Sequence, residues 1–222
     1  MALSSEEAVR DRLEYHNAAL KALGDEWDEG WKSVMEDIQD YVLPRRGFML
    51  SKGQEPNKIQ DIGQYILDGT ATRAVRLLAS GMHSHMTPPT RPWFRCRTLD
   101  PGLMEVRSVR EWWQAVEDIM RESLYRANFY NVQHSSYLDL AGFGYSAKYS
   151  QEDSDTTLLY RLLPVGSFYM GCDAKGRGNA LYRRFHMPLA QIVKKWGEDA
   201  LSPNLDSIWQ SAKSAPGNLG NA

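Results

Sequence analysis

The 222-residue chain has few cysteines, no long apolar run and almost no net charge. Its two cysteines, Cys96 and Cys172, are too few for a disulfide framework and too isolated for a metal cage. No segment approaches the roughly 20 consecutive apolar residues that span a membrane, and mean hydropathy is −0.51. The N-terminus shows no basic residue before an apolar block, so it predicts no signal peptide. These absences exclude a membrane protein and a secreted disulfide scaffold. The net charge of −2 excludes a chain that is polycationic throughout.

The patterns that mark catalytic and cofactor sites are also missing. The nearest match to a nucleophile elbow, residues 144–148 (GYSAK), lacks the final glycine of that sharp turn. No Walker loop or complete dinucleotide fingerprint occurs. His83 and His85 are two apart on a predicted helix and so point to different faces, while residues 152–155 (EDSD) lack the glycine and glutamate of a calcium loop. We therefore predict no catalytic, cofactor-binding or metal-ligating residue, and a protein that is not an enzyme.

Charge is instead distributed unevenly along the chain. Residues 25–40 contain one base, Lys32, and seven acids: Asp25, Glu26, Asp28, Glu29, Glu36, Asp37 and Asp40. Residues 69–99 contain no acid and five arginines: Arg73, Arg76, Arg91, Arg95 and Arg97. Such stretches are usually solvated faces of helices or strands. They also favour electrostatic docking between neighbouring subunits or onto a polyanion.

Helical periodicity dominates the first 140 residues. It predicts a helix from the capping box Ser4–Glu7 to a break at Gly24, a second over 27–42 that Pro44 ends, and a third over about 61–87. The third helix carries a stripe of mostly small residues, which predicts burial on more than one side: Ile66, Thr70, Ala74, Leu77 and Gly81, with Leu67, Ala71, Leu78 and Met82 beside it.

The next segment, residues 93–99, alternates well enough to predict a strand. A fourth helix follows with an apolar stripe at Trp112, Val116, Ile119, Met120 and Ser123. The adjacent Trp113 must point away from Trp112. A short helix over 129–140 comes after an interruption at Asn128.

The pattern then changes to a period of two. Strands are predicted over 145–150 and 158–163, and a hairpin over 168–171 and 181–186 around the turn 173–176. A last helix, 189–196, ends at Gly197. The fold class is α+β, with N-terminal helices packed with a small antiparallel sheet. We divide residues 1–213 into a helical hairpin (1–44), helices with one strand (58–140) and antiparallel strands plus a helix (143–197), followed by a flexible tail or truncation end (214–222).

The order of several motifs resembles the head-to-tail connector (portal) proteins of short-tailed bacteriophages. Residues 68–89 (DGTATRAVRLLASGMHSHMTPP) carry the clearest likeness, together with Pro92, Trp93 and Phe94. The further matching segments are 109–113, 124–130, 137–144, 164–169, 173–176, 183–184 and 191–197, and Trp31 and Pro44 match an early helix that ends in proline.

The resemblance implies a structural role in a ring, usually of twelve subunits, at one capsid vertex of the virion, assembled in the host cytoplasm. DNA is packaged and ejected through such a ring. The implied partners are other copies of the chain, capsid and scaffolding proteins, terminase, tail-adaptor proteins and double-stranded DNA, with no membrane and no cofactor. This segment looks like the N-terminal wing portion, without the clip, stem and crown of longer members. We therefore expect that it does not close a channel alone, and we carry over no DNA-contacting residue. The alternative is a nucleic-acid-binding module that uses the basic stretch Arg73–Arg97 outside viral assembly.

Overall fold

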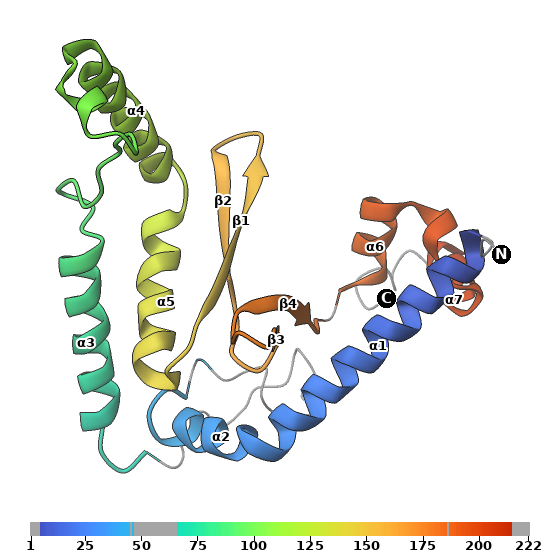
Figure 1. The fold of residues 1–222 in the computed structure, drawn as a ribbon. Helices are drawn as coiled ribbons and strands as arrows, with labels where there is room; N and C mark the ends of the chain where they lie inside the picture. The colour runs from blue at the N-terminus through green and yellow to red at the C-terminus, as the bar shows by residue number, and fades with distance from the viewer. Residues whose placement is uncertain (1–4, 45, 47–65, 186, 215–222) are drawn as a thin grey trace. The chain divides into compact units, whose positions relative to one another are not determined.

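The structure is a computed structural model that describes residues 5–44, 46, 66–185 and 187–214. The chain divides into two compact units, Met1–Tyr182 and Arg183–Ala222. Seven α-helices and two separate two-stranded sheets lie within the described residues (Figure 1). The predicted α+β class is confirmed. The single small sheet that we expected is two hairpins instead, and the finer division of residues 1–213 stays a prediction.

The first helix does not break at Gly24. Helix α1 runs over Ser5–Gly30 and α2 over Lys32–Tyr41, so the interruption falls at Trp31. Gly24 is buried, and a Cβ placed there would lie 3.7 Å from the ring of Tyr169. Gly24 therefore lies inside α1, beside Tyr169 of strand β3, and does not end the helix. Ser4 of the predicted capping box lies outside the described residues.

The third helix begins later than its periodicity suggests. Helix α3 spans Thr70–Met86 with Gly69 as its N-cap residue, and the carboxylate of Asp68 just before it accepts hydrogen bonds from the backbone N–H and the hydroxyl of Thr70 at 3.2 and 2.5 Å. Of the predicted earlier part, residues 61–65 lie outside the described residues. Helix α5, Phe129–Phe143, runs alongside α3 (Figure 1). A Cβ on Gly142 would overlap the side chain of Leu43, so this glycine permits the segment after α2 to approach α5 closely.

The predicted strand at residues 93–99 is wrong. The segment is extended but forms no ladder with any strand of the described chain. The backbone N–H of Cys96 donates instead to the carboxylate of Glu117, at 2.7 Å. Glu117 belongs to helix α4, Arg107–Arg126, which follows the short 3₁₀ helix η1, Gly102–Glu105. A helix side chain thus replaces a neighbouring strand as the hydrogen-bond partner.

Two hairpins follow α5. Strand β1, Ala147–Asp153, pairs antiparallel with β2, Thr157–Leu163, and β3, Phe168–Cys172, pairs with β4, Gly178–Arg183. The side chain of Asn128 extends the β2 edge: its Nδ2 donates to the carbonyl of Tyr160, and its Oδ1 accepts from the N–H of Tyr160, both at 2.8 Å. The predicted interruption at Asn128 is confirmed, and this pairing is its structural consequence.

The core of the first unit is small and lies where α2, α5 and the segment before β3 meet. Its buried residues are Met35, Leu43, Phe143 and Val165, with Trp27, Ile38, Val42, Val75, Leu138 and Tyr145 packed around them. Burial of this apolar surface is the main force that holds these segments together.

The second unit consists of helices after β4. Helix α6, Leu189–Trp196, ends at Gly197 as predicted, and Gly197 has the positive φ of 86° that favours glycine. The 3₁₀ helix η2, Glu198–Ala200, and helix α7, Pro203–Ser214, follow. Helix α7 was not predicted, although Trp209 and Ala212 on it are buried. Among the described residues, no helix combines the length and apolar character needed to cross a membrane.

Candidate functional site

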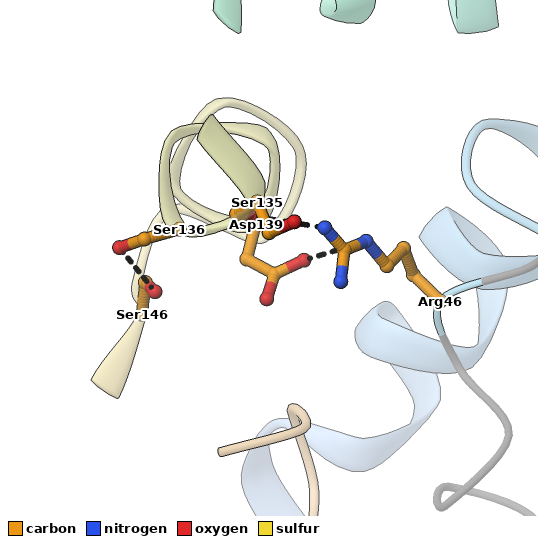
Figure 2. A network of polar contacts seen from close by, with 5 residues as sticks. All are labelled: Arg46, Ser135, Ser136, Asp139 and Ser146. Carbon is orange, nitrogen blue, oxygen red and sulfur yellow. Dashed lines mark hydrogen bonds and ion pairs between the residues drawn. The ribbon is translucent and has the colours of Figure 1, made fainter. Parts of the chain in front are cut away.

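A buried ion pair joins the segment after α2 to helix α5. Arg46 Nε lies 3.3 Å from Asp139 Oδ1, and Arg46 Nη2 donates to the carbonyl of Ser135 at 3.1 Å (Figure 2). Only 2% of Asp139 is exposed. Burial raises the pKa of Asp139 to about 6, against the opposing effect of Arg46. The pair therefore positions α5. It offsets only part of the free-energy cost of burying the Asp139 carboxylate, because Asp139 Oδ1 has no aligned hydrogen bond.

Sequence reasoning missed this pair. A signal was present, since Asp139 is the only charged residue in the apolar run 137–143 (YLDLAGF). Its partner could not be identified, because Arg46 is 93 positions away and nothing in its local pattern marks it. On the other side of α5, the hydroxyls of Ser136 and Ser146 lie 2.9 Å apart and tie the helix to the start of the first hairpin (Figure 2).

His83 and His134 belong to an aromatic cluster between α3 and α5. The ring of His83 lies 5.6 Å from that of His134 and about equally near Tyr130 and Tyr137. Burial and the neighbouring His134 lower the pKa of His83, so the cluster favours its neutral form. His85 is exposed. Within the described part of the chain, no three His, Cys, Asp or Glu side chains gather closely enough to hold a metal ion.

An aromatic groove opens between α1, α2 and strand β3. Its volume is about 470 Å³. We define the aromatic groove by its lining residues: Leu23, Glu26, Trp27, Trp31, Met35, Phe143, Gly144, Tyr145, Phe168, Tyr169 and Met170. Among the lining residues, Trp27 and Tyr169 pack edge to face, while Trp31 and Met170 are exposed at 60% and 57%. The groove is apolar, and Glu26 is its one charged lining residue.

The predicted small-residue stripe of α3 faces away from α5. The buried side of this helix carries Ala79, with Thr72, Val75 and His83 half-buried beside it. The opposite side carries what we call the outer face of α3: Thr70, Ala74, Leu77, Leu78 and Gly81. Leu77 and Leu78 are exposed at 75% and 54%. Within the part of the chain that the structure describes, the prediction that this stripe is buried is therefore wrong. The helix packs on one side and leaves a second apolar side open.

The acidic and basic stretches lie on different elements. Lys32 Nζ lies 3.9 Å from the carboxylate of Asp28 and 3.8 Å from that of Glu36. The exposed acids of this stretch are Asp25, Glu26, Glu29 and Asp37. All five arginines of the stretch 69–99 are exposed: Arg73 and Arg76 on α3, and Arg91, Arg95 and Arg97 in the extended segment after it. The chain thus presents an acidic surface on α1 and α2 and a basic surface on and after α3.

The aromatic residues near the basic segment are largely used in packing. Trp93 stacks on Phe129 with ring planes 4° apart, and Phe94 is half-buried. The segment therefore has one packed and one charged face, as its alternation predicts. On α4, Trp112 is 60% exposed whereas Trp113 is half-buried, so the two point differently, as expected. The predicted core stripe of α4 is not a core, because no residue of this helix is buried.

Comparison with known proteins relates the whole arrangement to one family. A family model described as bacteriophage head to tail connecting protein matches residues 10–218. The probable portal protein of Bordetella phage BPP-1 is 37% identical over 181 residues, which are 82% of this chain and 32% of that protein. The portal protein of Salmonella phage epsilon15 is 30% identical over 205 residues, 92% of this chain and 36% of that protein. The chain therefore spans about a third of the length of the curated relatives that it matches.

Proposed function

Because this chain belongs to the bacteriophage head to tail connecting protein family, we propose that it is part of a portal ring at one vertex of the phage capsid. In this role the ring conducts DNA during packaging and ejection, and tail proteins dock on it. The observation that carries the proposal is the family match over nearly the whole chain, together with two relatives named as portal proteins. A ring of twelve subunits, a terminase partner and assembly in the host cytoplasm are parts of the same proposal.

The surface of the chain supports a structural role. A ring needs contacts between unlike surfaces of identical subunits, so that each copy binds the next in one direction. The first unit offers two different uncovered apolar surfaces, the aromatic groove and the outer face of α3, which lie near opposite charges. No observation within the described residues favours the alternative of a separate nucleic-acid-binding module.

Labelling of virions tests the proposal. Antibodies raised against this chain should decorate a single vertex of particles of the phage that encodes it, seen by electron microscopy. Particles whose tails have been removed provide the control, because they expose the portal vertex more fully and should bind more label there. Label spread over the capsid, or absent from both kinds of particle, would contradict a portal role.

A further inference from the structure

We infer that the outer face of α3 in one copy of the chain docks into the aromatic groove of a second copy. The inference rests on the proposed ring and names the two surfaces that make its subunit contact. Both surfaces lie in the first unit, and each is already formed in the single chain.

The shape of the outer face suits insertion into a groove. Leu77 and Leu78 project from a helix whose neighbouring positions on that face are small, namely Ala74 and Gly81. A Cβ at Gly81 would meet nothing within 4 Å, so space for a close partner remains there. Small residues beside leucines allow two backbones to approach while the leucines fill a hollow. This is the arrangement of an amphipathic helix in a hydrophobic groove.

The groove has the composition of an interface centre. Aromatic residues and methionine are enriched at the buried centres of protein interfaces, where a few of them supply most of the affinity. Trp31 and Met170 stand exposed at its edge, and Trp27, Phe168 and Tyr169 form its wall. A surface of this kind is left exposed to water at a cost in free energy that a partner would relieve.

Opposite charges beside the two surfaces favour a second copy of the chain as the partner that fills the groove. Arg73 flanks the outer face of α3, Arg76 lies nearer the packed side beside Thr72, and the helix itself carries no acid. Among the described residues that line the groove, Glu26 is the one charged residue and none is basic. Opposite charges beside matching apolar surfaces favour one orientation of the pair, and like charges disfavour contact between two identical faces. Because the two surfaces are unlike, the contact repeats head to tail.

Disulfide trapping between two copies tests the inference. In a chain with both cysteines replaced (C96S and C172S), one sample receives Ala74→Cys on the outer face of α3 and another receives Met170→Cys at the groove edge. The two are mixed in equal amounts under mild oxidation. We expect the mixed disulfide dimer to form at least about tenfold faster than the control pair, because docking raises the local concentration of the two thiols. The control pair combines Ala74→Cys with Leu103→Cys, which is exposed on η1.

The outcomes separate the inference from the ring itself. Equal rates for the two pairs would overturn the assignment of surfaces, whether or not the chain associates. If sedimentation of the wild-type chain then still shows association, the ring proposal stands and other surfaces make its contact. The preference for the Ala74→Cys and Met170→Cys pair should also shrink when salt is raised from about 0.05 M to about 0.5 M, because the charged part of the contact is screened.

Discussion

At the scale of single residues, Asp139 is the most informative side chain. It is almost fully buried, it has one cationic neighbour, and its pKa is nevertheless raised. Desolvation therefore outweighs the attraction of Arg46, whose Nε approaches Asp139 Oδ1 without an aligned hydrogen bond. Pairs of this kind fix geometry more than they add stability, because removal of the charges from water costs about as much as their attraction returns.

The raised pKa of Asp139 predicts a pH-dependent stability. Asp139 has a pKa of about 6 in the folded chain, against an ordinary value of 3.8, so the folded state holds the proton more tightly than the unfolded state does. The stabilising contribution is complete below about pH 4 and is lost as pH rises through 6. Each unit of difference between the folded and unfolded pKa corresponds to about 1.4 kcal/mol, so the free energy of unfolding falls by on the order of 2–3 kcal/mol over this range.

Urea unfolding of the wild type and of Asp139→Asn between about pH 4 and pH 7 measures this contribution. As pH rises, the wild type should lose stability relative to Asp139→Asn, because only the wild type carries a group that titrates at this position. A difference that stays constant over this range would show that Asp139 titrates at its ordinary pKa in the folded chain.

Gly142 provides a test of close packing. A Cβ there overlaps Leu43, a buried core residue, and comes within 3.8 Å of Val75 on α3. Gly142→Ala should lower the free energy of unfolding by about 1–3 kcal/mol, because the core has to shift. The matched control is Gly81→Ala in α3, where the added methyl meets nothing within 4 Å. That control should be neutral or should stabilise by up to about 1 kcal/mol, since alanine is the better helix former. Equal effects of the two substitutions in urea unfolding would contradict the packing argument.

At the scale of elements, Asn128 couples the start of α5 to strand β2. Its amide makes both hydrogen bonds to the backbone of Tyr160 that a neighbouring strand would make. Asn128→Ala leaves this N–H and carbonyl without their partner, so we expect a loss of about 1–3 kcal/mol. Hydrogen exchange at the amide of Tyr160 should accelerate accordingly. Asn131→Ala, an exposed position in the first turn of α5, is the control and should change neither quantity.

The sequence predicts elements better where local rules decide them. Helix α6 and its end at Gly197 follow from periodicity and a glycine cap. The strands of the first hairpin follow from alternation, and the second hairpin follows from alternation and its turn residues. The sequence predictions fail where contacts between distant parts of the chain determine the local structure. Gly24 looks like a helix break until Tyr169 is seen to pack on it. Residues 93–99 look like a strand, but the backbone N–H of Cys96 donates to Glu117 instead of to a neighbouring strand.

The same limit applies to the candidate site. Amphipathic patterns identify the two sides of α3 and α4 but not which side faces the core of a single chain. On α3 the conspicuous stripe through Leu77 is the exposed side, and Ala79 and Val75 mark the packed one. The charge stretches could be read directly from the sequence. The aromatic groove could not, because its walls come from α1, α2, the end of α5 and β3, which are far apart in the chain.

At the scale of the whole molecule, the separation of charge predicts how copies meet. Arg73 borders the outer face of α3, and Glu26 lines the aromatic groove. An electrostatic contact between such surfaces weakens with salt and with charge reversal. We therefore expect association of the chain to decrease as salt is raised from about 0.05 M to about 0.5 M.

The double reversal Arg73→Glu with Arg76→Glu should weaken association more strongly than salt does, because it replaces attraction by repulsion from the acidic surface. Light scattering after size exclusion would report the mass of both proteins at equal concentration. A reversal of equal size in the turn between β3 and β4, Lys175→Glu with Arg177→Glu, controls for net charge, since both residues are exposed and lie on neither surface. If the two double variants reduce association equally, net charge rather than the α3 face governs assembly. If neither changes it, the charges on α3 take no part in the contact between copies.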